Sequence, residues 1–365
     1  MRGPFTGPAV WHGPDLADCD ERVLRLSSRQ IAELRAAPHT ARTPGTTPLR
    51  TAVAHFLLPT LAGELEGAAE ELASGRRWVL IKGVPVGELG EADAGAVLRA
   101  VGQYLGRPLP QGADGHALRR IGDTGGTVAG SAHSDCRTRA RAPFHTEESD
   151  LLGLLCLRPA RSGAVTSLVS SAAVHNALAD LRPDLVERLY RTHFFDRRDR
   201  HAPGECPYLA APIATRYGAA LSMRYDRCRL EAARSLAGVP RPEPADTELY
   251  DLVDRLAGSP RLRLDLHLEA GDLLLLDNHA VMHARSEFED FDEPERGHHR
   301  HLLPLRLARH RDTDPPGTAT TYGPRAKAAR RGTAPRDVIR LRSLSTTPTR
   351  TGHEGRDRRP HRGDG

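Results

Sequence analysis

His145 and Glu147 stand two residues apart, immediately before the apolar run "DLLGLLCLRP" that begins at Asp150. Side chains at positions i and i+2 of a strand point to the same side, so a strand start would present both of them together. Two histidines and one carboxylate on one side of a metal suit Fe(II) and leave its opposite side open. The pair therefore predicts part of a non-haem iron site, to which a distant strand must contribute the second histidine.

The same histidine-x-acid spacing occurs at His133/Asp135 and at His267/Glu269. The first of these pairs lies in a polar stretch rich in Ser and Gly, and the second leads directly into a turn at 270–272. Because neither pair enters an apolar strand, we expect both to lie away from the metal. The alternative for the pair before the apolar run is that it is simply polar, since short motifs often match by chance.

The segment "GDLLLLDNHAVMHAR" supplies two candidates for the second histidine, His279 and His283. Both stand close to a strongly apolar run that is typical of a buried strand. A histidine in such a place can bind the metal directly, or it can hydrogen-bond to a ligand and orient it. The residue types alone leave both assignments open.

The segments that must position these side chains are short strands interrupted by helices. This mixture predicts a mainly β fold with α insertions, in which a β-barrel or jelly-roll core has flanking helices. Serine before the first helix and Pro38 at its end are typical start and stop signals. Helical patterns cover 27–38, 50–74, 91–106 and 245–260, and strand patterns cover 76–86 and several segments after 143.

We expect three regions: an irregular and helical part (1–75) that packs on the core, the barrel itself (76–312) and a tail (313–365). The tail holds 12 Lys and Arg against 5 Asp and Glu, whereas the whole chain has a net charge of +5. The net positive charge therefore lies in the tail. For this reason, the charge of the whole chain is poor evidence that the folded part binds nucleic acid. A tail so rich in Pro, Gly, Thr and Arg is expected to be disordered, and its single aromatic residue, Tyr322, does not favour base stacking.

The five cysteines are odd in number and form no Cys-x-x-Cys pair. This usage favours reduced thiols in a cytoplasmic protein over a disulfide framework or a zinc–cysteine site. No apolar run approaches the roughly 18 residues that a membrane span requires. We therefore expect a cytoplasmic protein that has no membrane segment.

Four stretches, in this order along the chain, resemble the Fe(II)- and 2-oxoglutarate-dependent oxygenases of the taurine dioxygenase (TauD/TfdA) and clavaminate synthase-like superfamily. They are "FHTEESDLLGLLCLRPARSG", "GAVTSLVSSAAVHNAL", "LEAGDLLLLDNHAVMHARSEFED" and "RHLLPLRL", and "WVLIKGVPV" is similar to the family's early strand. The resemblance covers roughly residues 76–310. It implies a double-stranded β-helix, the jelly-roll core of that family.

By this resemblance His145, Glu147 and His283 are the iron ligands. His283 is preferred to His279 because the family reads Asn-x-x-x-x-His-x-Arg, a pattern that begins here at Asn278. Related halogenases lack the carboxylate ligand, which frees a position for halide. The presence of Glu147 therefore argues against halogenation.

The resemblance also implies that Arg300 binds the distal carboxylate of 2-oxoglutarate, with help from the hydroxyl of Thr166. A planar guanidinium can pair with a carboxylate through two parallel hydrogen bonds. Arg300 lies 17 residues beyond His283, a somewhat longer separation than is usual in the family. Arg296 is a weaker candidate, and the alternative for either arginine is a solvated surface charge.

One position departs from the family pattern. Many relatives carry a second arginine four residues after the cosubstrate arginine, where it often contacts an anionic group of the substrate, but this chain has Pro304 there. Arg224 could replace that contact, and Asp226 resembles acidic substrate contacts of relatives that hydroxylate amino acids. The alternative for both residues is a surface charge at a strand edge.

The resemblance implies an oxygenase that couples oxidation of 2-oxoglutarate by O2, at Fe(II), to hydroxylation of an unactivated C–H bond. We expect a small-molecule substrate, an amino acid or a derivative in specialised-metabolite biosynthesis. Desaturation or ring closure would use the same residues, and a non-catalytic binding protein on the same scaffold is a further alternative. Neither the exact substrate nor the oligomeric state follows from the sequence.

Overall fold

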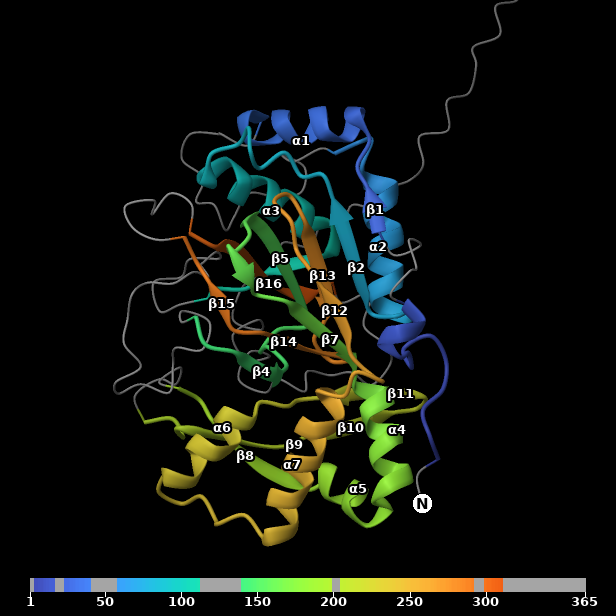
Figure 1. Cartoon of the computed structure of the whole chain (residues 1–365), viewed down its shortest axis with the longest axis vertical. Coiled ribbons are helices and arrows are strands. Elements are labelled where there is room, and N and C mark those ends of the chain that lie inside the picture. The colour runs from blue at the N-terminus through green and yellow to red at the C-terminus, as the bar shows by residue number, and fades with distance from the viewer. Residues whose placement is uncertain are drawn as a thin grey trace, which may run out of the picture. The chain divides into compact units, whose positions relative to one another are not determined.

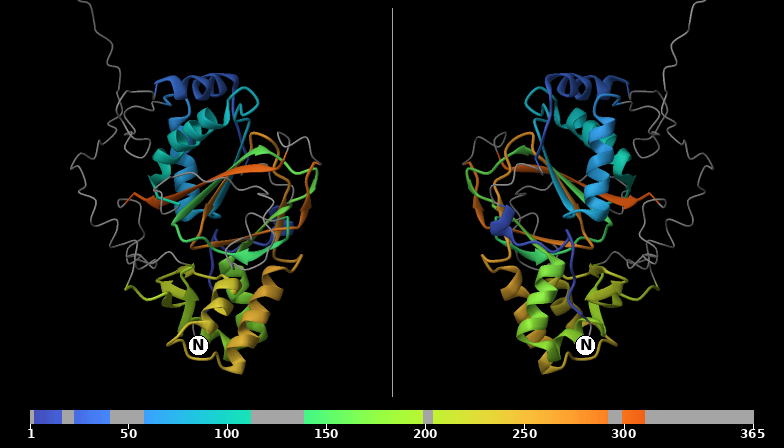
Figure 2. Two further views of the ribbon diagram at one scale, coloured as in Figure 1. Left: turned by 90° about the vertical axis from the view of Figure 1, so that its left-hand side faces the viewer. Right: turned by 90° about the vertical axis from the view of Figure 1, so that its right-hand side faces the viewer.

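The computed structural model describes residues 3–16, 23–40, 58–111, 139–198, 204–291 and 299–310. The predictions about His133/Asp135, Arg296 and the tail fall outside these residues. Within them, two β-sheets enclose a shared apolar interior, and helices lie outside the larger sheet (Figures 1 and 2). The predicted mainly β fold with α insertions is confirmed.

The larger sheet has six strands and the smaller one has four. All strand pairs within these two sheets are antiparallel except β1–β2. In spatial order the larger sheet consists of β1 (Val23–Arg25), β2 (Trp78–Lys82), β13 (Leu273–Asp277), β5 (Leu151–Arg158), β16 (His301–Arg309) and β3 (Gly106–Pro108), and the smaller sheet consists of β12 (Leu264–Leu266), β7 (Thr166–Ser170), β14 (Val281–Arg285) and β4 (Ala142–His145).

The position of strand β5 explains why its sequence is a continuous apolar run. Leu152 and Leu154 belong to the cluster that fills the interior between the sheets, together with Trp78. Leu151 and Leu155 belong to a second cluster on the outer face of the same sheet. A strand that is covered on both faces needs apolar residues at successive positions, which explains the absence of alternation.

Three helices cover the outer face of the larger sheet: α1 (Ser28–Thr40), α2 (Ala62–Ser74) and α3 (Glu91–Leu105). The first of them ends two residues beyond Pro38, the predicted stop. Leu65 of α2 and Val101 of α3 join the cluster that Leu155 and Leu305 complete from the sheet. None of the described helices is long and apolar enough to cross a membrane.

A long excursion, residues 171–263, joins β7 to β12 and occupies the lower part of Figure 1. Its apolar cluster, in which Phe195 and Tyr225 are almost fully buried, also includes Val169 of β7 and Met282 of β14. Its elements are α4 (Ser171–Leu181), α5 (Pro183–Leu189), β8 (Thr192–Asp196), β9 (Tyr208–Pro212), β10 (Ala214–Tyr217), β11 (Ala220–Met223), α6 (Arg227–Ala232) and α7 (Pro244–Ala257).

Candidate functional site

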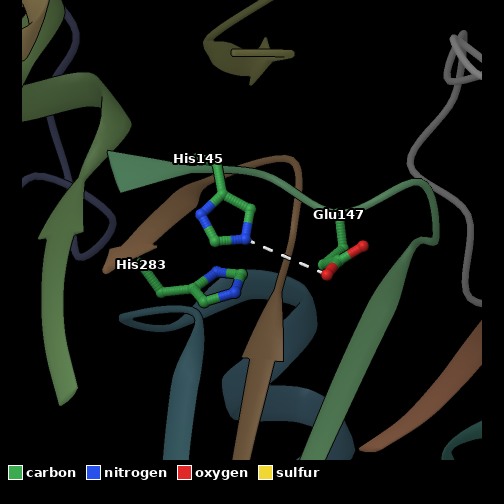
Figure 3. A group of neighbouring side chains, drawn as sticks. All are labelled: His145, Glu147 and His283. Carbon is green, nitrogen blue, oxygen red and sulfur yellow. Dashed lines mark ion pairs between the residues drawn. The ribbon is translucent and has the colours of Figure 1, made fainter. Parts of the chain in front are cut away.

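The pairing of β4 with β14 brings the two candidate histidines together. His145 is directly opposite His283 in the register of the two strands, and the centres of their rings are 4.3 Å apart. Glu147 follows two residues after His145, where the chain leaves β4. One ligand atom from each of the three side chains lies within 4.8 Å of the others, and Figure 3 shows them converging.

The hydrogen bonds of His145 determine which of its nitrogens is available. Its Nδ1 is 2.8 Å from the carbonyl oxygen of Pro143, which can only accept, so Nδ1 carries the proton. The bare Nε2 then faces Oε1 of Glu147, at 3.9 Å. A histidine that donates through one nitrogen to a backbone carbonyl and presents the other is typical of metal ligands.

His283 is held neutral by its surroundings. Burial, with a further contribution from His145, lowers the pKa of His283 to about 3. Its Nδ1 is buried and has no hydrogen-bond partner among the described residues. A neutral, buried imidazole with an unpartnered nitrogen fits a metal ligand, because a metal needs the unprotonated form.

Glu147 is fixed from two sides. Its backbone N–H donates to Oδ1 of Asn278 at 3.3 Å, and the amide of Asn278 also donates to Ser149. The guanidinium of Arg306, on β16, donates to Oε2 of Glu147 at 2.5 Å. The asparagine that begins the distal-histidine motif therefore holds the backbone of Glu147, and Arg306 holds its carboxylate.

The predicted cosubstrate residues line a cavity of about 330 Å³. Arg300 and Thr166 are 5% and 4% exposed and lie at its buried end with Cys156, whereas its rim includes the exposed His267. The alternative that Arg300 is a solvated surface charge is therefore wrong. The three candidate metal ligands are not among the residues that line this cavity.

The guanidinium of Arg300 is placed so that it could bind an anion. Its Nη1 is buried and has no hydrogen-bond partner among the described residues. Phe288 stacks near it, with the ring centre 5.1 Å from the guanidinium carbon, and Arg285 lies 4.9 Å from the same ring. Burial, followed by the charge of Arg285, lowers the pKa of Arg300 to about 10, which still leaves it protonated at neutral pH. A carboxylate of 2-oxoglutarate fits this environment.

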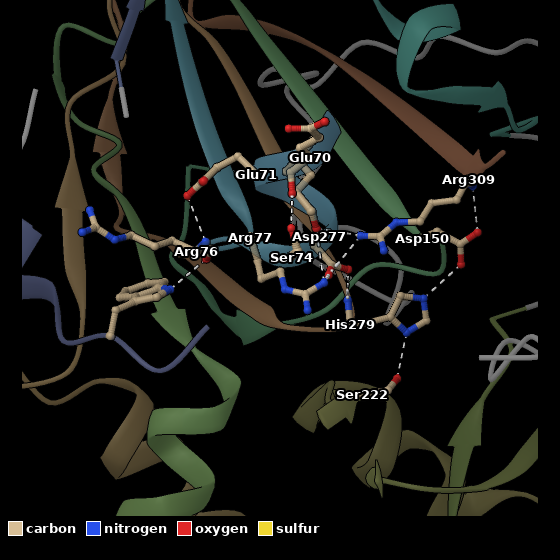
Figure 4. A network of polar contacts seen from close by, with 12 residues as sticks. Glu70, Glu71, Ser74, Arg76, Arg77, Asp150, Ser222, Asp277, His279 and Arg309 are labelled. Atoms are coloured by element: carbon tan, nitrogen blue, oxygen red, sulfur yellow. Dashed lines mark hydrogen bonds and ion pairs between the residues drawn. The ribbon is translucent and has the colours of Figure 1, made fainter. Parts of the chain in front are cut away.

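His279, the other histidine of the motif, takes part in a different network (Figure 4). Its Nδ1 is 2.7 Å from the hydroxyl of Ser222 on β11, and its Nε2 is 3.0 Å from Asp150. Asp150 in turn accepts from the backbone N–H of Arg309 at 3.0 Å. Both nitrogens of His279 are therefore engaged, and among the described residues the group with metal-binding spacing contains His283 instead.

The two candidate substrate residues lie between β11 and α6 of the excursion. Arg224 is 5% exposed, so the alternative of a strand-edge surface charge is wrong for this residue, and its guanidinium carbon is 5.9 Å from the ring centre of Phe195. Asp226 forms an isolated backbone bridge with His145, caps α6 by accepting from the N–H of Arg229, and lies 3.6 Å from Arg198. Asp226 thus adjoins the candidate metal site but already has two cationic or N–H partners.

Sequence reasoning did not single out Arg306. Its position relative to Glu147 depends on how β4 crosses over β16, two strands that belong to different sheets. A local signal did exist: Leu302, Pro304 and Arg306 alternate along β16, and Leu302 belongs to the interior cluster. Side chains at i, i+2 and i+4 of a strand share one face, so Arg306 could have been expected inside.

Comparison with known proteins agrees with this geometry. The sequence model of the taurine catabolism dioxygenase TauD, TfdA family matches residues 42–304. FR-33289 synthase of Streptomyces rubellomurinus is 27% identical over 335 residues, which cover 91% of this chain and 98% of that protein. A taurine hydroxylase-like protein of Stachybotrys chartarum is 26% identical over 301 residues, which cover 79% of this chain and 76% of that protein.

Two solved structures have a similar fold. An asparagine oxygenase in complex with Fe(II), 3-hydroxyasparagine and succinate has a TM-score of 0.59 at 18% identity and covers 79% of this chain and 93% of its own. The non-haem iron oxygenase OrfP with Fe and α-ketoglutaric acid has a TM-score of 0.58 at 20% identity and covers 82% and 98%. With the family model matching most of the sequence, this chain belongs to the TauD/TfdA family of Fe(II)- and 2-oxoglutarate-dependent dioxygenases.

Proposed function

We propose that this dioxygenase hydroxylates an unactivated C–H bond of an amino acid or amino-acid derivative, as a step in specialised-metabolite biosynthesis. The observation that carries the proposal is the convergence of His145, Glu147 and His283, which lie in or just after neighbouring strands β4 and β14 of the smaller sheet. Support for the substrate class comes from the relatives. OrfP has been solved with hydroxylated arginine, the asparagine oxygenase with hydroxyasparagine, and FR-33289 synthase carries the name of a single product.

In this proposal His145 and His283 hold iron as neutral imidazoles and Glu147 holds it as a carboxylate. When bound together, the metal and 2-oxoglutarate supply the oxidising chemistry that uses O2. Arg300 binds the distal carboxylate of the cosubstrate, with the hydroxyl of Thr166 as a second donor, because both are buried at one end of the same cavity. The burial of Arg300 would strengthen that ion pair, because charges interact more strongly away from water.

Arg224 and Asp226 are proposed to face the substrate. Support for this assignment comes from the backbone bridge between Asp226 and His145, which brings the start of α6 next to the candidate metal ligands. Because Arg198 and the N-terminus of α6 already engage Asp226, a cationic group of the substrate would have to compete with them. Arg224 is the better candidate for contacting an anionic group.

The proposed location is the cytoplasm. Support comes from cysteine usage, since no two of the described cysteines, Cys156, Cys206 and Cys228, form a disulfide with each other. Burial raises the pKa of Cys156 to about 12, which makes this thiol, beside the proposed cosubstrate site, unreactive.

Anaerobic titration of the Fe(II)-loaded protein with 2-oxoglutarate, followed by its metal-to-ligand charge-transfer band, tests cosubstrate binding. Candidate amino acids are then screened for stimulated succinate release in the presence of O2, and the products are examined by mass spectrometry. Hydroxylation adds one oxygen atom, whereas desaturation or ring closure removes two hydrogen atoms. A protein that binds 2-oxoglutarate but never forms succinate with any candidate would instead be a non-catalytic binding protein.

A further inference from the structure

Arg306 is a buried arginine that contacts a proposed metal ligand. It is 9% exposed, and its Nη2 donates to Oε2 of Glu147 at 2.5 Å. Its Nε is also buried, without a hydrogen-bond partner among the described residues. A guanidinium in such a place is costly to bury unless its charge is matched, and the carboxylate of Glu147 matches it.

The two carboxylate oxygens of Glu147 have different neighbours. Oε2 is taken by Arg306, whereas Oε1 faces the bare Nε2 of His145 at 3.9 Å. The backbone of Glu147 is held separately through Asn278. The carboxylate therefore has little freedom to rotate and present both oxygens on the side of the histidines.

The number of oxygens that Glu147 presents decides how many positions remain on the metal. With iron bound, two histidines and one carboxylate oxygen would leave the opposite side of the metal open for the cosubstrate and O2. A carboxylate that bound through both oxygens would occupy a fourth position and compete with the cosubstrate. A donor that retains Oε2 prevents this.

We propose that Arg306 is a positioning residue that restricts Glu147 to binding the metal through one oxygen, and so keeps the cosubstrate positions open. The inference rests on the proposed iron-binding function of Glu147. In this proposal Arg306 does not bind the substrate. The inner face of β16 has Pro304 where many relatives have a substrate-binding arginine. The next guanidinium on that face, that of Arg306, contacts the carboxylate of Glu147.

The experiment compares the parent protein with Arg306→Gln and Arg306→Lys under anaerobic conditions. We expect Arg306→Gln to retain Fe(II) but to weaken 2-oxoglutarate binding at least tenfold, as measured by the charge-transfer band. With Co(II) as the probe, the visible absorption of the variant should differ from that of the parent because the coordination differs. Arg306→Lys keeps one charged donor and should fall between the two in both measurements.

Arg309→Gln is the matched control. Arg309 lies on the same strand with a side chain that is 7% exposed, and it pairs with Asp277 at 3.0 Å, a carboxylate outside the candidate metal group. This variant should unfold at a lower temperature than the parent and yet keep the parent's Co(II) spectrum and 2-oxoglutarate affinity. A structural role alone would make the Arg306 variants behave in the same way as this control.

Parent-like Co(II) spectra and parent-like 2-oxoglutarate affinity in folded Arg306→Gln would overturn the inference. Should that variant not fold, a parent-like Co(II) spectrum in Arg306→Lys would overturn it equally. Failure of the proposed function has a different signature. In that case the parent itself shows no charge-transfer band with Fe(II) and 2-oxoglutarate.

Discussion

At the scale of single residues, His279 and His283 are four positions apart and have different partners. His283→Ala removes a proposed ligand, so we expect loss of tightly bound iron and of turnover. His279→Ala leaves buried Ser222 without a partner, which should cost about 1–3 kcal/mol of stability but leave iron bound. Iron per chain after anaerobic desalting, together with thermal unfolding, checks both. The opposite pattern would make His279 the ligand.

Arg300→Ala tests the cosubstrate anchor. Removing one partner of a buried ion pair costs about 3–5 kcal/mol, and each 1.4 kcal/mol is about tenfold in affinity. We therefore expect 2-oxoglutarate to bind at least a hundredfold more weakly in anaerobic titrations. Pro304→Ala, four residues further along the chain, should leave this affinity unchanged. If Arg300→Ala bound 2-oxoglutarate as tightly as the parent, another group would have to be the anchor.

The buried His283 predicts a pH dependence of the metal-free protein. Its pKa in the folded state is about 3, against an ordinary value of 6.5, so between these limits the unfolded chain binds more protons than the folded one. Stability should therefore fall as the pH falls from 6.5 towards 3. Chemical unfolding at a series of pH values checks this, and His283→Gln, which does not titrate, should show a shallower loss. Equal slopes for the two proteins would contradict the prediction.

At the scale of elements, a two-stranded sheet formed by segments far apart in the chain borders the proposed cosubstrate cavity. Strand β15 (Phe288–Glu289) pairs with β6 (Ser162–Gly163), and Gly163 has a φ of +73°. A Cβ on Gly163 would lie 2.3 Å from the carbonyl oxygen of Glu287 and 2.9 Å from Cα of Phe288. The glycine thus permits the close approach that holds the Phe288 ring beside Arg300.

Gly163→Ala should therefore displace β15 and weaken 2-oxoglutarate binding, in addition to the roughly 1–3 kcal/mol that a strained backbone costs. Gly218→Ala is the control: it also has a positive φ, +57°, but open space around its Cβ. That variant should lose some stability and keep the parent's affinity for 2-oxoglutarate. Equal affinities in both variants would show that the pairing of β6 with β15 does not shape the cavity.

Local patterns predicted the elements better than they predicted the contacts between them. The apolar runs at 151–157 and 273–276 indicated buried strands, and both are strands of the larger sheet. His145 and Glu147 were recognisable because a strand start aligns positions i and i+2. The burial of Arg224 was missed because it depends on the packing of the excursion, whose elements are brought together by residues far apart in the chain.

At the scale of the whole molecule, the tail is expected to be dispensable. So polar a segment buries little apolar surface and cannot contribute much to a core. We expect deletion of residues 313–365 to change the unfolding temperature and the rate of succinate formation only slightly. Soluble yield, calorimetry and turnover of the truncated protein check this. Insoluble protein or a large fall in the unfolding temperature would show that the tail packs against the barrel.

The excursion leaves the barrel from β7 and returns through β12, and these two strands pair with each other, Leu168 opposite Leu264. Its two ends therefore meet at a single place on one sheet, like the ends of a very long hairpin loop. The barrel keeps the candidate iron ligands and Arg300, whereas the excursion contributes Arg224 and Asp226. Because Arg224 and Asp226 are proposed to face the substrate, we expect an exchange of residues 171–263 for the corresponding segment of a relative to change substrate selectivity, while the candidate iron ligands and Arg300 remain those of this chain.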